Sequence, residues 1–330
     1  MSVIERHEIT SREAWLEWRR SDITASVAAA VFGNIHPYMS AYQLWAEKSG
    51  LWTPQPIDPR LARRGEVIEK IAPEIVREER PNWEITPNRL YYRDPEERIG
   101  ATPDLEARRP DMEGLGAVDV KSVGAQAFRK WKDRDTGETN LPIWMAVQLN
   151  VQAALMEAAW AVVAAITIGD GGLDVEIIDV PVMPALMQKF RLLAREFWRR
   201  VREKEPYDID WGKDAATILE MYAEDDGGGV DLTDDEEIDG ILRQRADYKI
   251  VERAGEVAAK QRKLYDAQLI HKLGNATWAR TKHGLVRAPT IHVKEAVRKA
   301  YTFRKISVTL SDEARETESP EPDRLAGEAQ

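Results

Sequence analysis

The amino-acid sequence predicts an α/β sandwich, in which a sheet has helices on both of its faces. Two observations predict it. Apolar residues recur at helical spacing over residues 63–80 and again over residues 184–203. Between these stretches lie short apolar runs bounded by turn-forming residues such as RDPEE and GDGG, which is typical of strands. A chain of 330 residues has room for one domain of about 200–250 residues and additional segments.

Helices are expected first along the chain. Residues 11–33 predict two short helices, the first of them capped by Ser11. Residues 41–48 predict a third helix, and residues 63–80 predict a longer one. The predicted strands cover residues 89–92, 99–107, 117–123, 160–168 and 175–182, and the later predicted helices cover residues 142–157 and 184–203.

Charge divides the rest of the chain. Residues 224–239 contain nine acidic and no basic residues, whereas residues 240–310 contain sixteen basic and five acidic ones. The basic segment could contact phosphates, although an ordinary solvated helix would look the same. We therefore expect four parts: a domain over residues 1–222, an acidic linker over 223–240, a basic helix with a small β unit over 241–310, and a disordered acidic tail over 311–330.

Composition excludes several classes of protein. The chain has no cysteine, which excludes disulfides, a thiolate nucleophile and cysteine-based zinc or iron–sulfur sites. The five histidines show no metal-binding spacing, and no glycine-rich phosphate loop is present. No apolar run approaches the roughly 18–20 residues of a membrane span, and the N-terminus has no apolar signal core. A soluble intracellular protein without a membrane partner is expected.

Three charged residues in the strand region point to chemistry. Asp104 lies in a strand-like segment, and Asp119 and Lys121 are two residues apart on the next strand, so that they project to the same face. Neighbouring strands would bring both carboxylates and the amine together. Such a set suits phosphodiester hydrolysis, since Asp104 and Asp119 can bind Mg²⁺ and Lys121 can orient or deprotonate water.

This arrangement resembles the PD-(D/E)XK nuclease motif, with Pro103-Asp104 followed by Asp119-Val120-Lys121. The resemblance implies a restriction-endonuclease-like fold, with a mixed central sheet flanked by helices and here a C-terminal helical and β extension. It also implies Mg²⁺ or Mn²⁺ as the cofactor. Asp119 stands where many members have Glu, whose longer side chain would hold the metal farther from the strand.

Two neighbouring helices carry further matches to this family. The family has a Glu four residues after a Gly, and Glu69 matches that spacing after Gly65. Glu66 would share the same face, so the choice between the two stays open. In the later helix, Gln148 matches the family's active-site Gln, and Asn150 stands where a second Gln is usual.

The N-terminal stretch WRRSDITAS is similar to the opening signature of phage-type exonucleases. By this resemblance Arg19 and Ser26 bind a 5′-terminal phosphate, and Thr102 is a further phosphate candidate. A guanidinium group suits this task because it can bind phosphate through two hydrogen bonds.

The order of these motifs over residues 11–205 resembles the YqaJ-like viral recombinases and the lambda-type, or phage alkaline, exonucleases. The resemblance implies a metal-dependent DNA exonuclease that acts 5′→3′ on double-stranded ends for phage-type recombination. It further implies a single-strand annealing protein as a partner, a trimeric ring, and a phage or prophage protein in the cytoplasm of a bacterial host. Two alternatives stay open: an endonuclease or single-strand-specific nuclease of the same fold, and an inactive DNA-binding scaffold.

Overall fold

The computed structural model describes residues 3–55, 58–169 and 172–222, and beyond them only residues 237, 240–241, 244, 248, 250–251, 253–257, 278–281 and 284–287. The chain divides into two units, Met1–Tyr222 and Ala223–Gln330. The first unit contains two sheets and most of the described helices. In the described part of the chain, no helix has both the length and the apolar character needed to cross a membrane.

The larger sheet is mixed, as predicted. Its strand order is β3-β6-β7-β8-β9, in which β7 and β8 run parallel and the other neighbours run antiparallel. The near-continuous apolar sequence of β8 fits its burial in the centre of the first unit. The strands are β3 (Glu84–Pro87), β6 (Leu105–Arg109), β7 (Met112–Gly124), β8 (Trp160–Gly169) and β9 (Gly172–Val180).

The smaller sheet has the order β1-β4-β5-β2, with β2 and β5 parallel. Its strands are β1 (Glu5–Glu8), β2 (Ile23–Thr24), β4 (Leu90–Asp94) and β5 (Ile99–Ala101). The prediction of one strand over residues 99–107 was wrong, because the chain leaves this sheet at Ala101 and enters the larger one at Leu105. Pro103 lies in the break and has no N–H to give to a ladder. Asp104 therefore lies between the two sheets and not within a strand.

The described helices agree with most of the predicted ones. Ser11 caps α1 through its side chain, and Pro73 lies inside α3. The second helix predicted within residues 11–33 is instead the strand β2 followed by a short 3₁₀ helix. The helices are α1 (Arg12–Ser21), the 3₁₀ helix η1 (Ala25–Val31), α2 (Ala41–Lys48), α3 (Pro59–Glu79), α4 (Ala125–Arg129), α5 (Ile143–Met156), α6 (Pro184–Glu203) and α7 (Trp211–Met221).

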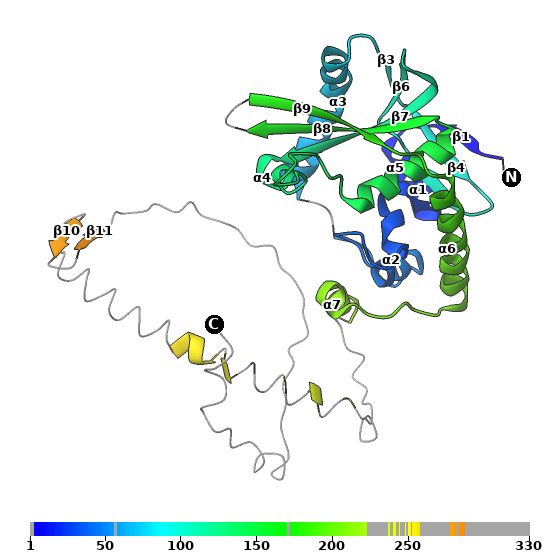
Figure 1. Ribbon diagram of the computed structural model, residues 1–330. Helices are drawn as coiled ribbons and strands as arrows, with labels where there is room; N and C mark the ends of the chain where they lie inside the picture. The colour runs from blue at the N-terminus through cyan, green and yellow to red at the C-terminus, as the bar shows by residue number, and fades with distance from the viewer. Residues whose placement is uncertain are drawn as a thin grey trace. The chain divides into compact units, whose positions relative to one another are not determined.

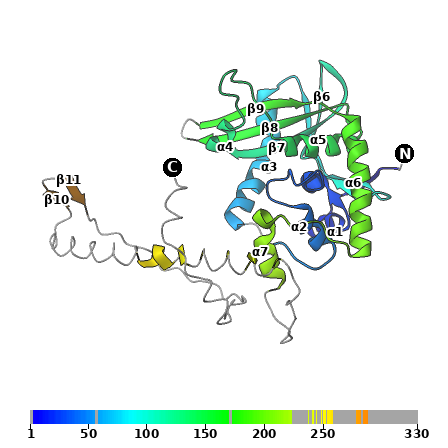
Figure 2. The same ribbon diagram turned by 60° about the horizontal axis from the view of Figure 1, so that its bottom comes forward.

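Helices cover both faces of the larger sheet, each with its own apolar cluster. On one face, Ile68, Ala72 and Val76 of α3 pack against apolar residues of β7 and β8. On the other face, α5 packs against the sheet, and η1, α2 and α6 complete that cluster. Figures 1 and 2 show α5 between the sheet and the helices α1 and α2. Most residues of α5 are buried, among them the polar Gln148, Asn150 and Gln152.

Sequence analysis did not predict α7, which is held by a buried carboxylate. Asp214 is fully buried and accepts hydrogen bonds from Ser40 Oγ at 2.5 Å and from the Asp210 N–H at 2.8 Å. Next to it, Lys213 Nζ donates to the carbonyl oxygen of Asn34 at 2.6 Å. These polar contacts join α7 to the segment between η1 and α2.

In the second unit, β10 (Trp278–Thr281) and β11 (Gly284–Arg287) form an antiparallel pair within the range predicted for a small β unit. The predicted acidic linker, basic helix and tail lie mostly outside the described residues. The four-part division of the chain therefore stays a prediction.

Candidate active site

The structure brings the two predicted metal ligands to one end of the contact between β6 and β7. Leu105 pairs with Val118, so that Asp104 lies level with Asp119. The Asp104 carboxylate accepts a hydrogen bond of 2.6 Å from the Val120 N–H. The Asp104 side chain thus satisfies a backbone N–H of β7 at a point where β6 has ended.

Asp119 is the centre of a cluster of polar side chains that lies between β7 and α5. Its residue is 2% exposed, and its Oδ2 lies 2.5 Å from Lys121 Nζ. Its Oδ1 accepts hydrogen bonds from Gln148 Nε2 at 2.7 Å and from Gln152 Nε2 at 2.9 Å. The strand β7 thus supplies the carboxylate and the amine, and α5 supplies two amides.

The carboxylates repel each other at close range. Burial, followed by the charge of Asp119, raises the pKa of Asp104 to about 8. Burial lowers the pKa of Lys121, but Asp119, Asp104 and Glu69 outweigh this effect, and the pKa is raised overall. Lys121 therefore keeps its positive charge, and a bound cation would relieve the repulsion that keeps Asp104 protonated beside Asp119.

Glu69, and not Glu66, takes part in the electrostatics of this site. Burial first, and then the charges of Asp119 and Glu66, raise the pKa of Glu69, and Lys121 opposes them. Glu66 instead forms an ion pair with Arg12 on α1 at 3.2 Å. The electrostatic interactions with Asp104, Asp119 and Lys121 therefore favour Glu69, which is an exposed residue of α3.

Sequence analysis missed Gln152 and expected Asn150 at the second amide position. Asn150 faces away from Asp119: its Nδ2 donates to the carbonyls of Ala146 and Pro181, and its Oδ1 accepts from the Met183 N–H at 2.6 Å. Gln152 is one helical turn after Gln148 and shares its face. The spacing of two glutamines by four residues in an apolar helix was the signal that could have identified it.

The predicted phosphate-binding residues also lie together. Arg19 Nη2 donates to Ser26 Oγ at 3.2 Å, and Ser26 Oγ lies 3.0 Å from Thr24 Oγ1. The Arg19 guanidinium lies 4.6 Å from the centre of the Trp15 ring. Trp15 Nε1 in turn donates to Thr102 Oγ1 at 3.1 Å. Trp15 was not predicted, and it joins Arg19 to Thr102.

Arg19, Ser26 and Thr102 form what we call the phosphate-binding cluster. Thr102 connects this cluster to the two carboxylates. Its carbonyl oxygen lies 3.5 Å from Gln152 Nε2, and Asp104 follows two residues later in the same break between sheets. The hydrogen bonds Trp15–Thr102, Thr102–Gln152 and Gln152–Asp119 therefore run without interruption from one group to the other.

The residues fit a divalent cation with few protein ligands. Apart from the ion pair with Lys121, Asp119 Oδ2 accepts no hydrogen bond, and Gln152 Oε1 is buried without a partner among the described residues. No three His, Cys, Asp or Glu side chains of that same part of the chain form a metal-binding group. Mg²⁺ is commonly held by one or two carboxylates and several waters, and Asp104 and Asp119 would be the carboxylates that hold it here.

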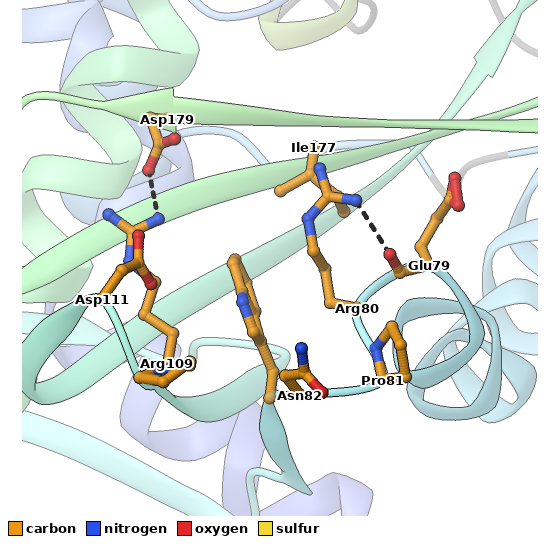
Figure 3. A pocket seen from close by; sticks show the side chains of 10 residues that line it. Glu79, Arg80, Pro81, Asn82, Arg109, Asp111, Ile177 and Asp179 are labelled. Carbon is orange, nitrogen blue, oxygen red and sulfur yellow. Dashed lines mark hydrogen bonds and ion pairs between the residues drawn. The ribbon is translucent and has the colours of Figure 1, made fainter.

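A surface pocket of about 480 Å³ lies elsewhere and contains none of these site residues. It is formed by the end of α3, the turn between β6 and β7, and β9 (Figure 3). Arg109 donates to Asp179 at 2.7 Å there, and its guanidinium lies 4.5 Å from the centre of the Trp160 ring. These contacts hold Arg109 against β8 and β9 at the wall of the pocket.

The fold and this residue arrangement define the class. A mixed sheet flanked by helices, with Asp104 beside Asp119-Val120-Lys121 on the central strand β7, is the restriction-endonuclease-like, PD-(D/E)XK architecture. Residues 14–159 match the family model of the YqaJ-like viral recombinase domain. The match confirms the predicted resemblance to the YqaJ-like viral recombinases, and the matched residues include all the site residues above.

Solved structures show weaker likenesses. An alkaline exonuclease (LHK-Exo) from Laribacter hongkongensis is 19% identical, with 63% of this chain and 99% of that chain covered and a TM-score of 0.43. The complex of LHK-Exo with dAMP is 18% identical, with 63% of this chain and 99% of that chain covered and a TM-score of 0.44. A SOX–DNA complex is 10% identical, with 60% of this chain and 70% of that chain covered and a TM-score of 0.35. Likenesses of this extent carry no argument about chemistry. No protein of the curated set matches.

Proposed function

We propose that this chain is a metal-dependent deoxyribonuclease that removes nucleotides from the 5′ ends of double-stranded DNA, with Mg²⁺ or Mn²⁺ as its cofactor. One observation carries the proposal: Lys121 Nζ lies 2.5 Å from the Asp119 carboxylate, and the Asp104 carboxylate accepts a hydrogen bond from the N–H of Val120, which stands between Asp119 and Lys121 on β7. Two acids and an amine at one point are what phosphodiester hydrolysis requires.

The side chains would divide the work as follows. Asp104 and Asp119 hold the cation, which when bound polarises the phosphate and lowers the pKa of water. Gln148 and Gln152 occupy one oxygen of Asp119 and leave the other directed at Lys121. Lys121 then orients the attacking water or takes its proton and neutralises charge that develops on the phosphate.

The phosphate-binding cluster supports digestion from the end of a DNA strand. The Arg19 guanidinium donates to the Ser26 hydroxyl and lies over the Trp15 ring, so a phosphate beside Ser26 could accept a charge-assisted hydrogen bond from it. A terminal 5′ phosphate carries more negative charge than an internal phosphodiester, and a guanidinium with a hydroxyl beside it would bind it preferentially. A grip on the 5′ end would give a 5′→3′ direction.

The YqaJ-like domain supports a place in phage-type homologous recombination, in which resection of a duplex produces single strands. We propose a single-strand annealing protein as the partner that would receive them. We also propose that copies of the chain assemble around DNA as a trimeric ring, in the cytoplasm of a bacterial host that carries the phage or prophage.

The test is digestion of linear duplex DNA with and without a 5′ phosphate, in Mg²⁺ and in EDTA, beside a closed circular duplex. We expect digestion that needs Mg²⁺, prefers the phosphorylated end and spares the circle. Asp119→Asn should lower the rate of digestion by a factor of at least about 10², while binding to the linear duplex persists.

Other outcomes would favour the alternatives. Cutting of the circle would indicate an endonuclease, and preference for single strands would indicate a single-strand-specific nuclease of the same fold. DNA binding without digestion by the wild type, across metals and pH, would indicate an inactive scaffold.

A further inference from the structure

Three aromatic side chains, His36, Tyr38 and Trp144, form a cluster that the proposed chemistry does not use. Each ring contacts both of the others edge-on. The centroid distances are 5.5 Å for His36–Trp144, 6.0 Å for His36–Tyr38 and 6.3 Å for Tyr38–Trp144. His36 is 6% exposed, whereas Tyr38 is 81% exposed. The aromatic cluster therefore has a buried base and a solvent-facing rim.

The turn that presents Tyr38 is held by polar contacts on several sides. Asn34 has a left-handed backbone with a φ of 60°, and its Oδ1 accepts from the Ala41 N–H at 2.8 Å. The Tyr38 N–H donates to His36 Nδ1 at 3.2 Å. From α7, Lys213 Nζ donates to the carbonyls of Asn34 and His36. The exposed tyrosine therefore stands on a fixed turn.

The aromatic cluster is built on two elements that also carry residues of the candidate active site. On one side, His36 and Tyr38 follow η1, which contains Ser26 and shares an apolar cluster with α5. On the other side, Trp144 precedes Gln148 by one helical turn on α5, and Gln148 donates to Asp119. A nucleotide whose phosphates reach Ser26 and Asp119 would place its base near these rings.

We propose that the aromatic cluster is a nucleobase-binding site, in which the base of a nucleotide at the 5′ end of the bound strand stacks on the exposed ring of Tyr38, against which His36 and Trp144 pack edge-on. The proposal rests on the proposed action at DNA ends and adds the group that holds the base. Stacking suits a recombination nuclease because every base has a π face, so that binding tolerates any sequence. Lys213, the cation beside the turn, is engaged with main-chain carbonyls, which favours a base over a further phosphate here.

The test compares binding to two kinds of end in EDTA, where no cleavage is expected. Linear duplexes with a 5′ phosphate carry either normal nucleotides or one abasic residue at the first, second or third position of the phosphorylated strand. We expect the wild type to bind the normal end about fivefold to a hundredfold more tightly than the abasic end at one of these positions. In Tyr38→Ala this difference should disappear, and in Tyr38→Phe it should remain, since the ring is kept.

Trp211→Ala is the matched control, because Trp211 is an exposed aromatic residue on α7 outside the aromatic cluster, and it should keep the full difference. Equal binding of normal and abasic ends by the wild type would overturn the inference alone and leave end binding intact. The inference would also be overturned if Tyr38→Ala still bound the normal end more tightly than the abasic end by the same factor as the wild type. Failure of the wild type to bind any duplex end would overturn both this inference and the proposed function.

Discussion

Gln152 donates a 2.9 Å hydrogen bond to the carboxylate of Asp119, across the contact between α5 and the sheet. Gln148 donates to the same oxygen from one turn earlier. Two amides on one carboxylate oxygen hold its plane in a single orientation, and the second oxygen stays directed at Lys121. The helix α5 is thus a positioning element for an acidic group on β7.

We expect Gln152→Ala to lower the rate of DNA digestion by about tenfold to a hundredfold. The reason is that residues which orient a metal-binding side chain commonly contribute to this extent. The rate should be measured at saturating and at limiting Mg²⁺, because loss of orientation should also raise the Mg²⁺ concentration needed for half-maximal activity.

Asn150→Ala serves as the control for Gln152→Ala. Asn150 lies on the same helix but bonds to the main chain of Ala146, Pro181 and Met183. Its loss should lower the free energy of unfolding by about 1–3 kcal/mol, since buried backbone groups lose their partner, and should change the rate little. Equal effects of the two substitutions on digestion would contradict the assignment of Gln152.

The two candidate glutamates of α3 can be separated by neutral replacements. Glu69→Gln should lower digestion about tenfold or more, because Glu69 shares the electrostatic environment of Asp104 and Lys121. Glu66→Gln should change it less than twofold, since that exposed side chain pairs with Arg12 and exposed pairs contribute little. Steady-state digestion of a phosphorylated linear duplex measures both, and a larger loss in Glu66→Gln would reverse the choice.

Arg19→Ala should remove most of the preference for a 5′-phosphorylated end. A charge-assisted hydrogen bond contributes roughly 1.5–3 kcal/mol, which corresponds to a loss of about tenfold to a hundredfold in relative affinity. Arg20→Ala is the control, because Arg20 is 74% exposed in its side chain and pairs with Glu17. The ratio of rates on phosphorylated and unphosphorylated ends should be unchanged in Arg20→Ala.

Stability should fall in mild acid because of His36. Burial, with a smaller effect of Lys213, lowers the pKa of His36 below its ordinary value of 6.5. The unfolded chain therefore takes up this proton first, and the stability that neutral His36 contributes is present above pH 6.5 and is lost as the pH falls below it. The loss is at most about 1.4 kcal/mol per pH unit. Thermal unfolding between pH 7 and 5 should show it, and the slope should be shallower in His36→Gln.

Most of the elements followed from the sequence because their patterns are local. The helix predicted over residues 184–203 is α6, and the strands predicted over 160–168 and 175–182 correspond to β8 and β9. Asp119 and Lys121 could be placed on one face because strand geometry alternates side chains. The third member of the set, Asp104, was also predicted, but it was placed within a strand and not in the break between the two sheets.

What could not be predicted depends on long-range contacts. The chain changes sheets between Ala101 and Leu105, and only the pairing of β5 with β2 and of β6 with β7 shows this. Asn150 and Gln152 differ by two residues and point in different directions, which depends on the exact phase of α5. The helix α7 was missed because its buried Asp214 looks like a solvent-facing residue in the sequence.

The break at Thr102–Asp104 joins the residues proposed for end recognition to those proposed for metal binding. The Thr102 hydroxyl accepts a hydrogen bond from the indole of Trp15, and two residues later the Asp104 carboxylate accepts one from the N–H of Val120. A displacement of Arg19 would therefore be transmitted to Asp104 through the side chains of Trp15 and Thr102. Substitutions of Arg19 and Asp104 should consequently be non-additive in duplex affinity measured with Ca²⁺, and strict additivity would show that the hinge between the sheets transmits nothing.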